Sequence, residues 1–164
     1  MDSSHIQDID IRAAVITVST TRNKDSDISG KTIIEMLEKA NLDLGSYEVV
    51  PDDINRIKEA VFKALESSNC IIVNGGTGLT HDDCTIEAVS PIFEKTIDGF
   101  GELFRFKSYE DIGTRALLSR AAAGIYKEKA IFCIPGSTGA VKLAMEEIIL
   151  PEIKHILTHA SKRS

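Results

Sequence analysis

Residues 70–88 constrain the possible fold more strongly than any other segment of the chain. The segment reads CIIVNGGTGLTHDDCTIEA, so a short apolar run is followed by a glycine-rich turn and then by apolar residues at helical spacing. This order predicts a buried strand, a tight turn and a helix. Three glycines in four positions permit positive φ angles and expose main-chain N–H groups, and the start of a helix adds unpaired donors. Such a turn suits a phosphate group.

The two carboxylates that follow this turn, Asp82 and Asp83, allow two interpretations. Beside a phosphate they would repel it unless a cation stood between them, so the segment also suggests Mg²⁺. Alternatively, the glycines only form a tight turn and the aspartates cap the helix. The motif alone leaves both interpretations open.

The other apolar runs predict the architecture around this turn. Residues 13–18 and 130–134 are continuously apolar, which is typical of parallel strands covered on both faces. Helical periodicity over residues 29–40 and 54–65 separates the early strands. We therefore expect an α/β fold with a mostly parallel central sheet.

Two predicted strands end in polar side chains, which would lie at the carboxyl edge where α/β sheets bind ligands. The first strand ends in residues 19–22, whose hydroxyls and arginine either line a crevice or form a solvated turn. The strand over residues 47–50 is followed by Asp52 and Asp53. Asp53 can cap the next helix, whereas Asp52 is either a free surface charge or a crevice residue.

A second glycine turn repeats the pattern of the first. The strand over residues 130–134 is followed by Pro135, Gly136 and Ser137 and then by an apolar-periodic helix. If the two strands are neighbours, both turns can contribute N–H groups to a single anion site.

The later segments are harder to assign. Residues 96–110 are rich in phenylalanine and read as irregular, so they either fill the edge of the core or meet another subunit. Residues 113–123 have helical composition, with Gly124 positioned to end the helix and with Arg115 or Arg120 able to face an anion. Pro151 is expected to break the last helix.

His155 and His159 stand four residues apart in this last region. The spacing suits zinc, but no third ligand is near in the sequence, so no zinc site is predicted. The three cysteines form no C-x-x-C pair, and their odd number fits reduced thiols in a cytosolic protein.

Composition and charge narrow the class of protein. At 164 residues the chain fits one domain, which we assign to residues 11–160 after a flexible N-terminal tail at residues 1–10. The net charge of −6 and the lack of a basic stripe argue against a nucleic-acid partner. The chain opens with no basic, apolar leader, and no run approaches the ~18 apolar residues of a membrane span, so we expect no membrane association and a cytoplasmic location.

Four motifs in order resemble the MoaB/MogA family of molybdenum cofactor biosynthesis proteins, and are closest to its MoaB branch. They are NGGTGLTHDDCT from Asn74, GFGELFR from Gly99, LSRAAAG from Leu118 and IPGST from Ile134. The resemblance covers residues 10–157.

The resemblance implies an α/β/α three-layer domain that forms a homotrimer, or a hexamer made of two trimers, and binds molybdopterin. Active members of the family use Mg²⁺ and ATP to transfer AMP to the terminal phosphate of molybdopterin, which gives adenylylated molybdopterin and pyrophosphate. A MoeA-like molybdate insertase acts downstream and loads molybdate or tungstate. The alternative is a non-catalytic molybdopterin-binding or assembly protein of the same pathway.

The resemblance also assigns site residues by position. Asp52 and Asp83 become the catalytic carboxylates that hold Mg²⁺ through ATP, and Asp82 is a possible further metal ligand. Asn74 stands where the family usually has threonine, and Asp82 where it has arginine or glycine. The expected substrate- and phosphate-binding residues are Ser19, Asn74, Gly75, Gly76, Thr77, Gly78, Pro135, Gly136 and Ser137.

Overall fold

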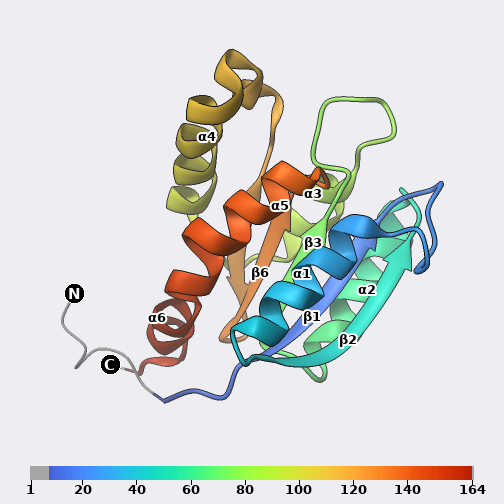
Figure 1. Ribbon diagram of the computed structural model, residues 1–164. Helices are drawn as coiled ribbons and strands as arrows, with labels where there is room; N and C mark the ends of the chain where they lie inside the picture. Colours follow the sequence, from blue (N-terminus) through green and yellow to red (C-terminus); the bar gives the residue numbers. More distant parts are fainter. Residues whose placement is uncertain (1–7, 164) are drawn as a thin grey trace.

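The computed structural model describes residues 8–163 (Figure 1). Most of the tail predicted at residues 1–10 lies outside the described residues. The described chain builds one six-stranded sheet in the order β2-β1-β3-β6-β5-β4. In chain order the strands are β1 (Arg12–Val18), β2 (Asp43–Val50), β3 (Cys70–Asn74), β4 (Lys95–Thr96), β5 (Ala122–Tyr126) and β6 (Lys129–Ile134).

Four of the strands run parallel and the other two lie antiparallel at one edge. β1 pairs in parallel with both β2 and β3, and β3 pairs in parallel with β6. β5 is antiparallel to β6 and β4 is antiparallel to β5. The prediction of a mostly parallel α/β sheet is confirmed.

Helices cover both faces of this sheet, as Figure 1 shows with α1 and α5 on one side and α2 on the other. They are α1 (Ile28–Lys39), α2 (Ile54–Leu65), α3 (Thr85–Val89), α4 (Asp98–Ile112), α5 (Thr138–Ala144) and α6 (Leu150–Ser161). Alternate strand residues enter two separate cores, one beneath α1, α4, α5 and α6 and the other beneath α2 and α3. Burial on both faces explains why the strand sequences are continuously apolar rather than alternating.

The chain order creates a switch point at the carboxyl edge of the sheet. From β1 the chain crosses through α1 to β2 on one side, and α2 then returns it to β3 on the other side of β1. The connections that leave the ends of β1 and β3 therefore run in opposite directions along the sheet. Folds of this kind bind ligands at such a point. Both the first glycine turn and the polar exit of β1 lie there.

Three sequence predictions in the later part of the chain are wrong. Residues 96–110 are not irregular but form most of α4, because Phe100 and Phe104 are buried and Phe100 lies 5.3 Å from the Phe132 ring in the sheet. Residues 113–123 are not a helix: a 3-10 turn (Gly113–Leu118) is followed by β5.

Tertiary contacts explain the second error. Gly124 does not end a helix but lies in β5, where a Cβ atom would stand 2.2 Å from the Phe93 ring. The strand therefore needs glycine for the close approach of an aromatic ring. An alanine-rich composition suggested a helix, and packing against Phe93 and β6 overrides it.

The third error concerns Pro151, which does not break the last helix. A π-helical turn (Met145–Ile149) joins α5 to α6, and Pro151 stands in the first turn of α6. A proline at that position needs no hydrogen-bond donor, and the wider turn before it lets the chain continue in helical form.

The expected cap of α2 is confirmed, since Asp53 accepts a hydrogen bond from Arg56 N. Asp27 caps α1 in the same way by accepting one from Gly30 N. Cys70 and Cys133 are buried, and burial raises the pKa of each thiol to about 12. Among the described helices none is long and apolar enough to cross a membrane.

Candidate functional site

The two glycine turns lie side by side, as expected if their strands were neighbours. β3 and β6 are adjacent and parallel, with Asn74 opposite Ile134 at their carboxyl ends. Gly75 N donates a 2.9 Å hydrogen bond to Ile134 O, and a Cβ atom on Gly136 would lie 3.4 Å from Gly75 Cα. Main-chain groups from both turns therefore face the same region at the edge of the sheet.

The first turn requires glycine at two successive positions. Gly75 has φ of 97° and Gly76 has φ of 69°, which side-chain-bearing residues rarely adopt. A Cβ atom on Gly75 would stand 2.5 Å from Val18 O, a main-chain atom of β1, and one on Gly76 would stand 2.4 Å from Thr85 Oγ1. Because the Gly75 N–H is already bonded to Ile134 O, an anion at this turn can use the N–H groups of the residues that follow Gly75.

On the β1 side of this turn is a crevice of about 550 Å³. We call it the acidic crevice because three carboxylates line it. Asp52 Oδ2 accepts a 2.7 Å hydrogen bond from the Thr20 hydroxyl, and Asp52 N donates to Thr20 Oγ1 at 3.2 Å. This mutual contact fixes Asp52 at the end of β2. The acidic crevice is lined by Val18, Ser19, Thr20, Thr21, Asp52, Gly76, Asp82 and Asp83.

The carboxylates after the first turn differ in what holds them. Asp83 Oδ2 accepts a 3.1 Å hydrogen bond from Thr80 N, which anchors the half-buried side chain within its loop. Asp82 is exposed. Cys84 is the N-cap of α3 and makes no side-chain cap hydrogen bond, so the helix-capping interpretation of the aspartates is wrong.

On the β6 side of the turn is a second crevice of about 300 Å³, which we call the mixed crevice. It combines apolar side chains with one arginine and several hydroxyls. The two crevices share Gly76 and Asp83, so the first turn forms the boundary between them. The mixed crevice is lined by Gly76, Thr77, Gly78, Asp83, Phe104, Ser108, Ile112, Arg115, Ala116, Leu118, Ser119, Pro135, Gly136, Ser137 and Ala140.

The side chain of Asn74 faces neither crevice. It is fully buried and makes three hydrogen bonds: its Oδ1 accepts from the Ser29 hydroxyl at 2.8 Å, and its Nδ2 donates to Thr17 Oγ1 at 2.9 Å and to Ile16 O at 3.3 Å. Asn74 therefore ties the ends of β1 and β3 to the start of α1. It supports the first turn from beneath.

A buried carboxylate completes this support. Asp27 has 0% exposure and accepts hydrogen bonds from Tyr47 Oη at 2.6 Å, from Ser29 Oγ at 3.2 Å and from Gly30 N at 3.0 Å. Burial acts to raise the pKa of Asp27, but the hydrogen bonds that it accepts, including one from Thr17, outweigh burial and lower it. The ionised carboxylate is thus satisfied inside the protein.

The two arginines that sequence reasoning proposed for anion binding have different surroundings. Arg115 lines the mixed crevice. Arg120 instead pairs with Glu87 through both guanidinium Nη atoms, and its Nε donates to Gly78 O at 2.9 Å. The hydrogen bond from Arg120 lowers the pKa of Glu87. Arg120 therefore braces the first turn against α3 and is committed to that contact.

The donor chemistry of the acidic crevice fits a hard cation such as Mg²⁺, since carboxylate oxygens are its usual protein ligands. Over residues 8–163, no three His, Cys, Asp or Glu side chains come close enough to hold a metal by themselves. Mg²⁺ bound by Asp52 and Asp83 would take its other ligands from water and from a polyphosphate. This is the usual way in which Mg²⁺ binds at nucleotide sites.

Cys84 lies near these carboxylates but is a poor nucleophile. Partial burial raises the pKa of its thiol, and the negative charges of Asp52, Glu87, Asp53 and Asp83 raise it further. A thiolate is needed for nucleophilic attack, so the surroundings keep Cys84 in its unreactive form.

Some of the crevice residues escaped sequence reasoning. The contact of Thr20 with Asp52 joins two strand ends 32 residues apart, which no local pattern reveals. Ser108 and Phe104 reach the mixed crevice from α4, a helix that the sequence did not predict. Ser19, by contrast, lines the acidic crevice as expected. Gly75 lies between the end of β1 at Val18 and the end of β6 at Ile134.

Comparison with known proteins places this chain in a family. The family model described as "Probable molybdopterin binding domain" matches residues 14–155. The molybdenum cofactor biosynthesis protein B of Staphylococcus aureus (strain MRSA252) is 51% identical over 156 residues, which cover 93% of each chain. The chain therefore has the fold and sequence of the molybdopterin-binding α/β class.

Solved structures agree with this class and narrow it to one branch. A crystal structure of a molybdenum cofactor biosynthesis protein B has a TM-score of 0.91 at 45% identity and covers 96% of this chain and 99% of that one. The tungsten cofactor synthesizing protein MoaB from Pyrococcus furiosus has a TM-score of 0.87 at 42% identity, with 93% and 98% coverage. This chain belongs to the MoaB branch of the molybdenum cofactor biosynthesis family, and the resemblance found in its motifs is confirmed.

Proposed function

We propose that this protein binds molybdopterin and transfers AMP from ATP to its terminal phosphate, with release of pyrophosphate. The observation that carries the proposal is the pair of unlike crevices that meet at Gly76 and Asp83. One crevice has the carboxylates that a magnesium–polyphosphate complex needs. The other has apolar walls and a cation suited to a flat, anionic ligand. A reaction between two phosphate-bearing substrates needs such a junction.

In this proposal each crevice holds one substrate. ATP lies in the acidic crevice, where Asp52 and Asp83 hold Mg²⁺ on its phosphates. The pterin lies in the mixed crevice beside Phe104, with its phosphate directed toward the glycine turns and Arg115. The main-chain N–H groups of the two turns then face the phosphates of both substrates.

The transfer needs positioning and charge neutralisation more than proton transfer. A phosphate oxygen of molybdopterin forms a new bond to the α-phosphorus of ATP, and the bond between the α-phosphorus and the bridging oxygen to the β-phosphate breaks. Pyrophosphate leaves with the electron pair of that bond. The attacking phosphate is already ionised at pH 7, so no general base is required. Mg²⁺, when bound, offsets the negative charge that the phosphates bring together.

The experiment is incubation of the purified protein with molybdopterin, Mg²⁺ and ATP, with mass spectrometry of the pterin product. The wild-type protein is expected to form adenylylated molybdopterin. Asp52→Asn and Asp83→Asn should each lower its rate by about 100-fold or more, the usual cost of losing a transition-state contact. Asp43→Asn, an exposed residue at the far end of β2, is the matched control and should keep the wild-type rate.

The second candidate function is a non-catalytic protein that binds molybdopterin and presents it to a partner. Asp82 favours it, because this exposed carboxylate lines the same crevice as Asp52 and Asp83 and adds negative charge beside a polyphosphate. That function predicts pterin binding without Mg²⁺- and ATP-dependent pyrophosphate release. A wild-type protein that binds the pterin and forms no adenylylated product would overturn the catalytic proposal and support this one.

We also propose that the protein is a homotrimer, or a hexamer made of two trimers, and that a MoeA-like insertase takes up its product. An apolar surface on α4 and the 3-10 turn after it supports association between subunits. Phe106 is 65% exposed and Leu117 is 71% exposed, although Phe100 and Phe104 of the same helix are buried. Exposed apolar surface of this extent is typical of contact surfaces between proteins. The surface consists of Leu103, Phe106, Tyr109, Ile112, Leu117 and Leu118.

A further inference from the structure

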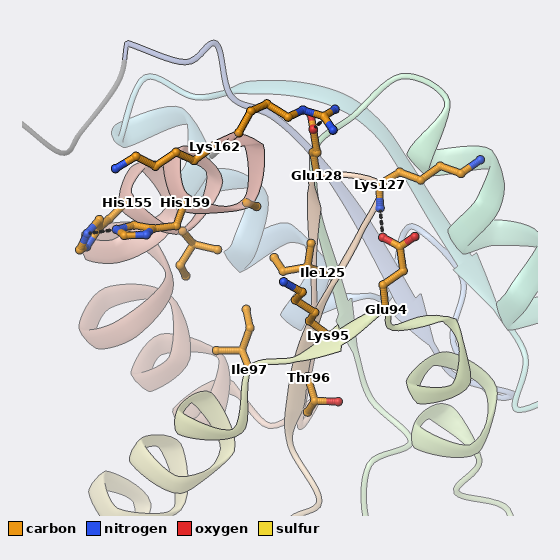
Figure 2. Close-up of a pocket in the computed structure, with 13 residues that line it drawn as sticks. Glu94, Lys95, Thr96, Ile97, Ile125, Lys127, Glu128, His155, His159 and Lys162 are labelled. Carbon is orange, nitrogen blue, oxygen red and sulfur yellow. Dashed lines mark hydrogen bonds and ion pairs between the residues drawn. The ribbon is translucent and has the colours of Figure 1, made fainter.

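A larger cavity lies away from the proposed reaction site, between α6 and the β4–β5 edge of the sheet. Its volume is about 990 Å³, and Figure 2 shows its lining residues. The cavity opens beside the hairpin that precedes β6, and the second glycine turn follows Ile134 at the other end of that strand. A strand of this length spans about 17 Å, so the cavity and the proposed reaction site lie at opposite ends of β6. No residue of the two crevices lines this cavity.

Two histidines meet at the rim of this cavity. His155 and His159 lie one helical turn apart on α6, and their Nε2 atoms are 3.0 Å apart. Figure 2 shows the two imidazole rings directed toward one another at the side of the helix. His155 is half-buried and His159 is exposed, so an ion from solvent can reach both nitrogens.

Glu152 fixes the tautomer of one ring. His155 Nδ1 lies 3.2 Å from Glu152 Oε2. An ionised carboxylate can only accept a hydrogen bond, so Nδ1 carries the ring proton and Nε2 keeps a free lone pair. A carboxylate on the far nitrogen is the usual support for a metal-binding histidine, because it orients the ring and raises its basicity.

The 3.0 Å separation is that of a hydrogen bond between the two Nε2 atoms, so the metal preference comes from donor chemistry and not from this distance. Two imidazole nitrogens one helical turn apart can bind one ion once the rings turn toward it. Affinity for nitrogen ligands rises through Ni²⁺ to Cu²⁺ among the divalent first-row metals and falls again at Zn²⁺.

We propose that His155 and His159 form a two-nitrogen binding site for a divalent copper or nickel ion, with Glu152 as the positioning residue. Water or a small anion fills the remaining positions. In the metal-free protein His159 Nε2–H donates to His155 Nε2. On metal binding, the His159 proton is carried on Nδ1 instead, and the two rings turn so that both Nε2 lone pairs are directed to the ion.

The charges around the cavity distinguish this site from the acidic crevice. Lys95, Lys127 and Lys162 line the cavity, and their side chains form no ion pair with a described residue. The two carboxylates in the lining are engaged, because Glu128 pairs with Arg163 and Glu94 accepts a hydrogen bond from Lys127 N. These amines disfavour Mg²⁺, which binds mainly through charge and prefers oxygen ligands. Cu²⁺ and Ni²⁺ bind imidazole nitrogen strongly enough to tolerate them, and the amines can attract an anion as a further ligand.

The test is titration of the full-length protein with Cu²⁺ by calorimetry and by electron paramagnetic resonance, in excess Mg²⁺. His155→Gln and His159→Gln should each weaken Cu²⁺ binding by about 100-fold, because the second bond of a chelate forms at high effective concentration. The wild-type spectrum should show coupling of Cu²⁺ to two imidazole nitrogens, and the spectrum of each single variant should show coupling to one. The double variant His5→Gln with His81→Gln removes the other two histidines and should bind as the wild type does.

The support from Glu152 has its own readout. Glu152→Ala should weaken Cu²⁺ binding by about tenfold while the spectrum still shows two imidazole nitrogens. Circular dichroism of each variant confirms that it is folded. Equal Cu²⁺ affinity in the wild type and in His159→Gln, or loss of binding in the His5/His81 double variant, would overturn the proposal.

Discussion

Replacement of Tyr47 by phenylalanine removes one oxygen atom from the network beneath the first glycine turn, and its effect can be worked out from the structure. The Tyr47 hydroxyl donates a 2.6 Å hydrogen bond to Asp27, which has 0% exposure. A hydrogen bond to a charged buried group contributes about 1.5–3 kcal/mol. We therefore expect Tyr47→Phe to lower the free energy of unfolding by about 2 kcal/mol, which for a chain of this length lowers Tm by about 4–8 °C.

The same substitution should change the pH dependence of stability. The pKa of Asp27 is lowered in the folded protein, so its ionised form stabilises the fold above the unfolded pKa of about 4. That stabilisation is lost as the pH falls through the lower folded pKa. Without the Tyr47 hydroxyl the folded pKa of Asp27 rises. The difference in unfolding free energy between wild type and variant should therefore be largest near pH 7 and should narrow below about pH 4.

Urea denaturation and thermal scans at one fixed protein concentration measure both effects, since association would shift Tm with concentration. Tyr126→Phe is the matched control. Tyr126 lies outside the apolar surface of α4, and its hydroxyl makes no hydrogen bond with a described residue, so its loss should change Tm by less than about 1 °C. If Tyr47→Phe lowered Tm no more than Tyr126→Phe does, the Asp27 network would not support the fold as argued.

Three further predictions concern the turn, the acidic crevice and the apolar surface. Gly75→Ala should lower the free energy of unfolding in urea by about 2 kcal/mol or more, because Gly75 has a positive φ and a Cβ atom there would contact β1. Gly139→Ala is the control and should not lower it, since no atom lies within 4 Å of a Cβ atom at that position. Equal values for the two variants would contradict the strain expected at Gly75. Asp82→Asn should lower the KM for ATP several-fold at low ionic strength, and the effect should fade near 1 M salt, where the Debye length is about 3 Å. Phe106→Asp should convert an oligomer to monomer by light scattering, whereas an unchanged mass would exclude this surface from the interface.

The sequence was most informative where one local pattern sufficed. Buried parallel strands, the two glycine turns and the cap of α2 each follow from a few neighbouring residues, and the structure agrees. Whether the two turns lie side by side depends on the order of the strands in the sheet, which local sequence patterns do not reveal. The structure places β3 beside β6, so the two turns are neighbours.

The failures lie where distant packing decides local structure. α4 has apolar residues on more than one side, because Phe104 enters the core while Phe106 faces outward. Its helical period was therefore hidden in the sequence. β5 follows it with an alanine-rich sequence whose pairing with β6 is invisible locally. α4 carries the residues of the mixed crevice that went unrecognised, Ser108 and Phe104, so the error in the fold became an error in the site.

The two positions that depart from the family pattern have different consequences once their side chains are placed. Asn74 is fully buried and bonds only to β1 and α1, so exchange with threonine affects how firmly the first turn is held. Asp82 lies exposed on the acidic crevice and faces the same space as Asp52 and Asp83. A phosphate about 4 Å from such a charge experiences a repulsion of about 1–4 kcal/mol, depending on how much water screens it. That range extends from a modest rise in KM to loss of ATP binding. We therefore expect the proposed activity to depend on solvent access at Asp82 more than on the substitution at Asn74.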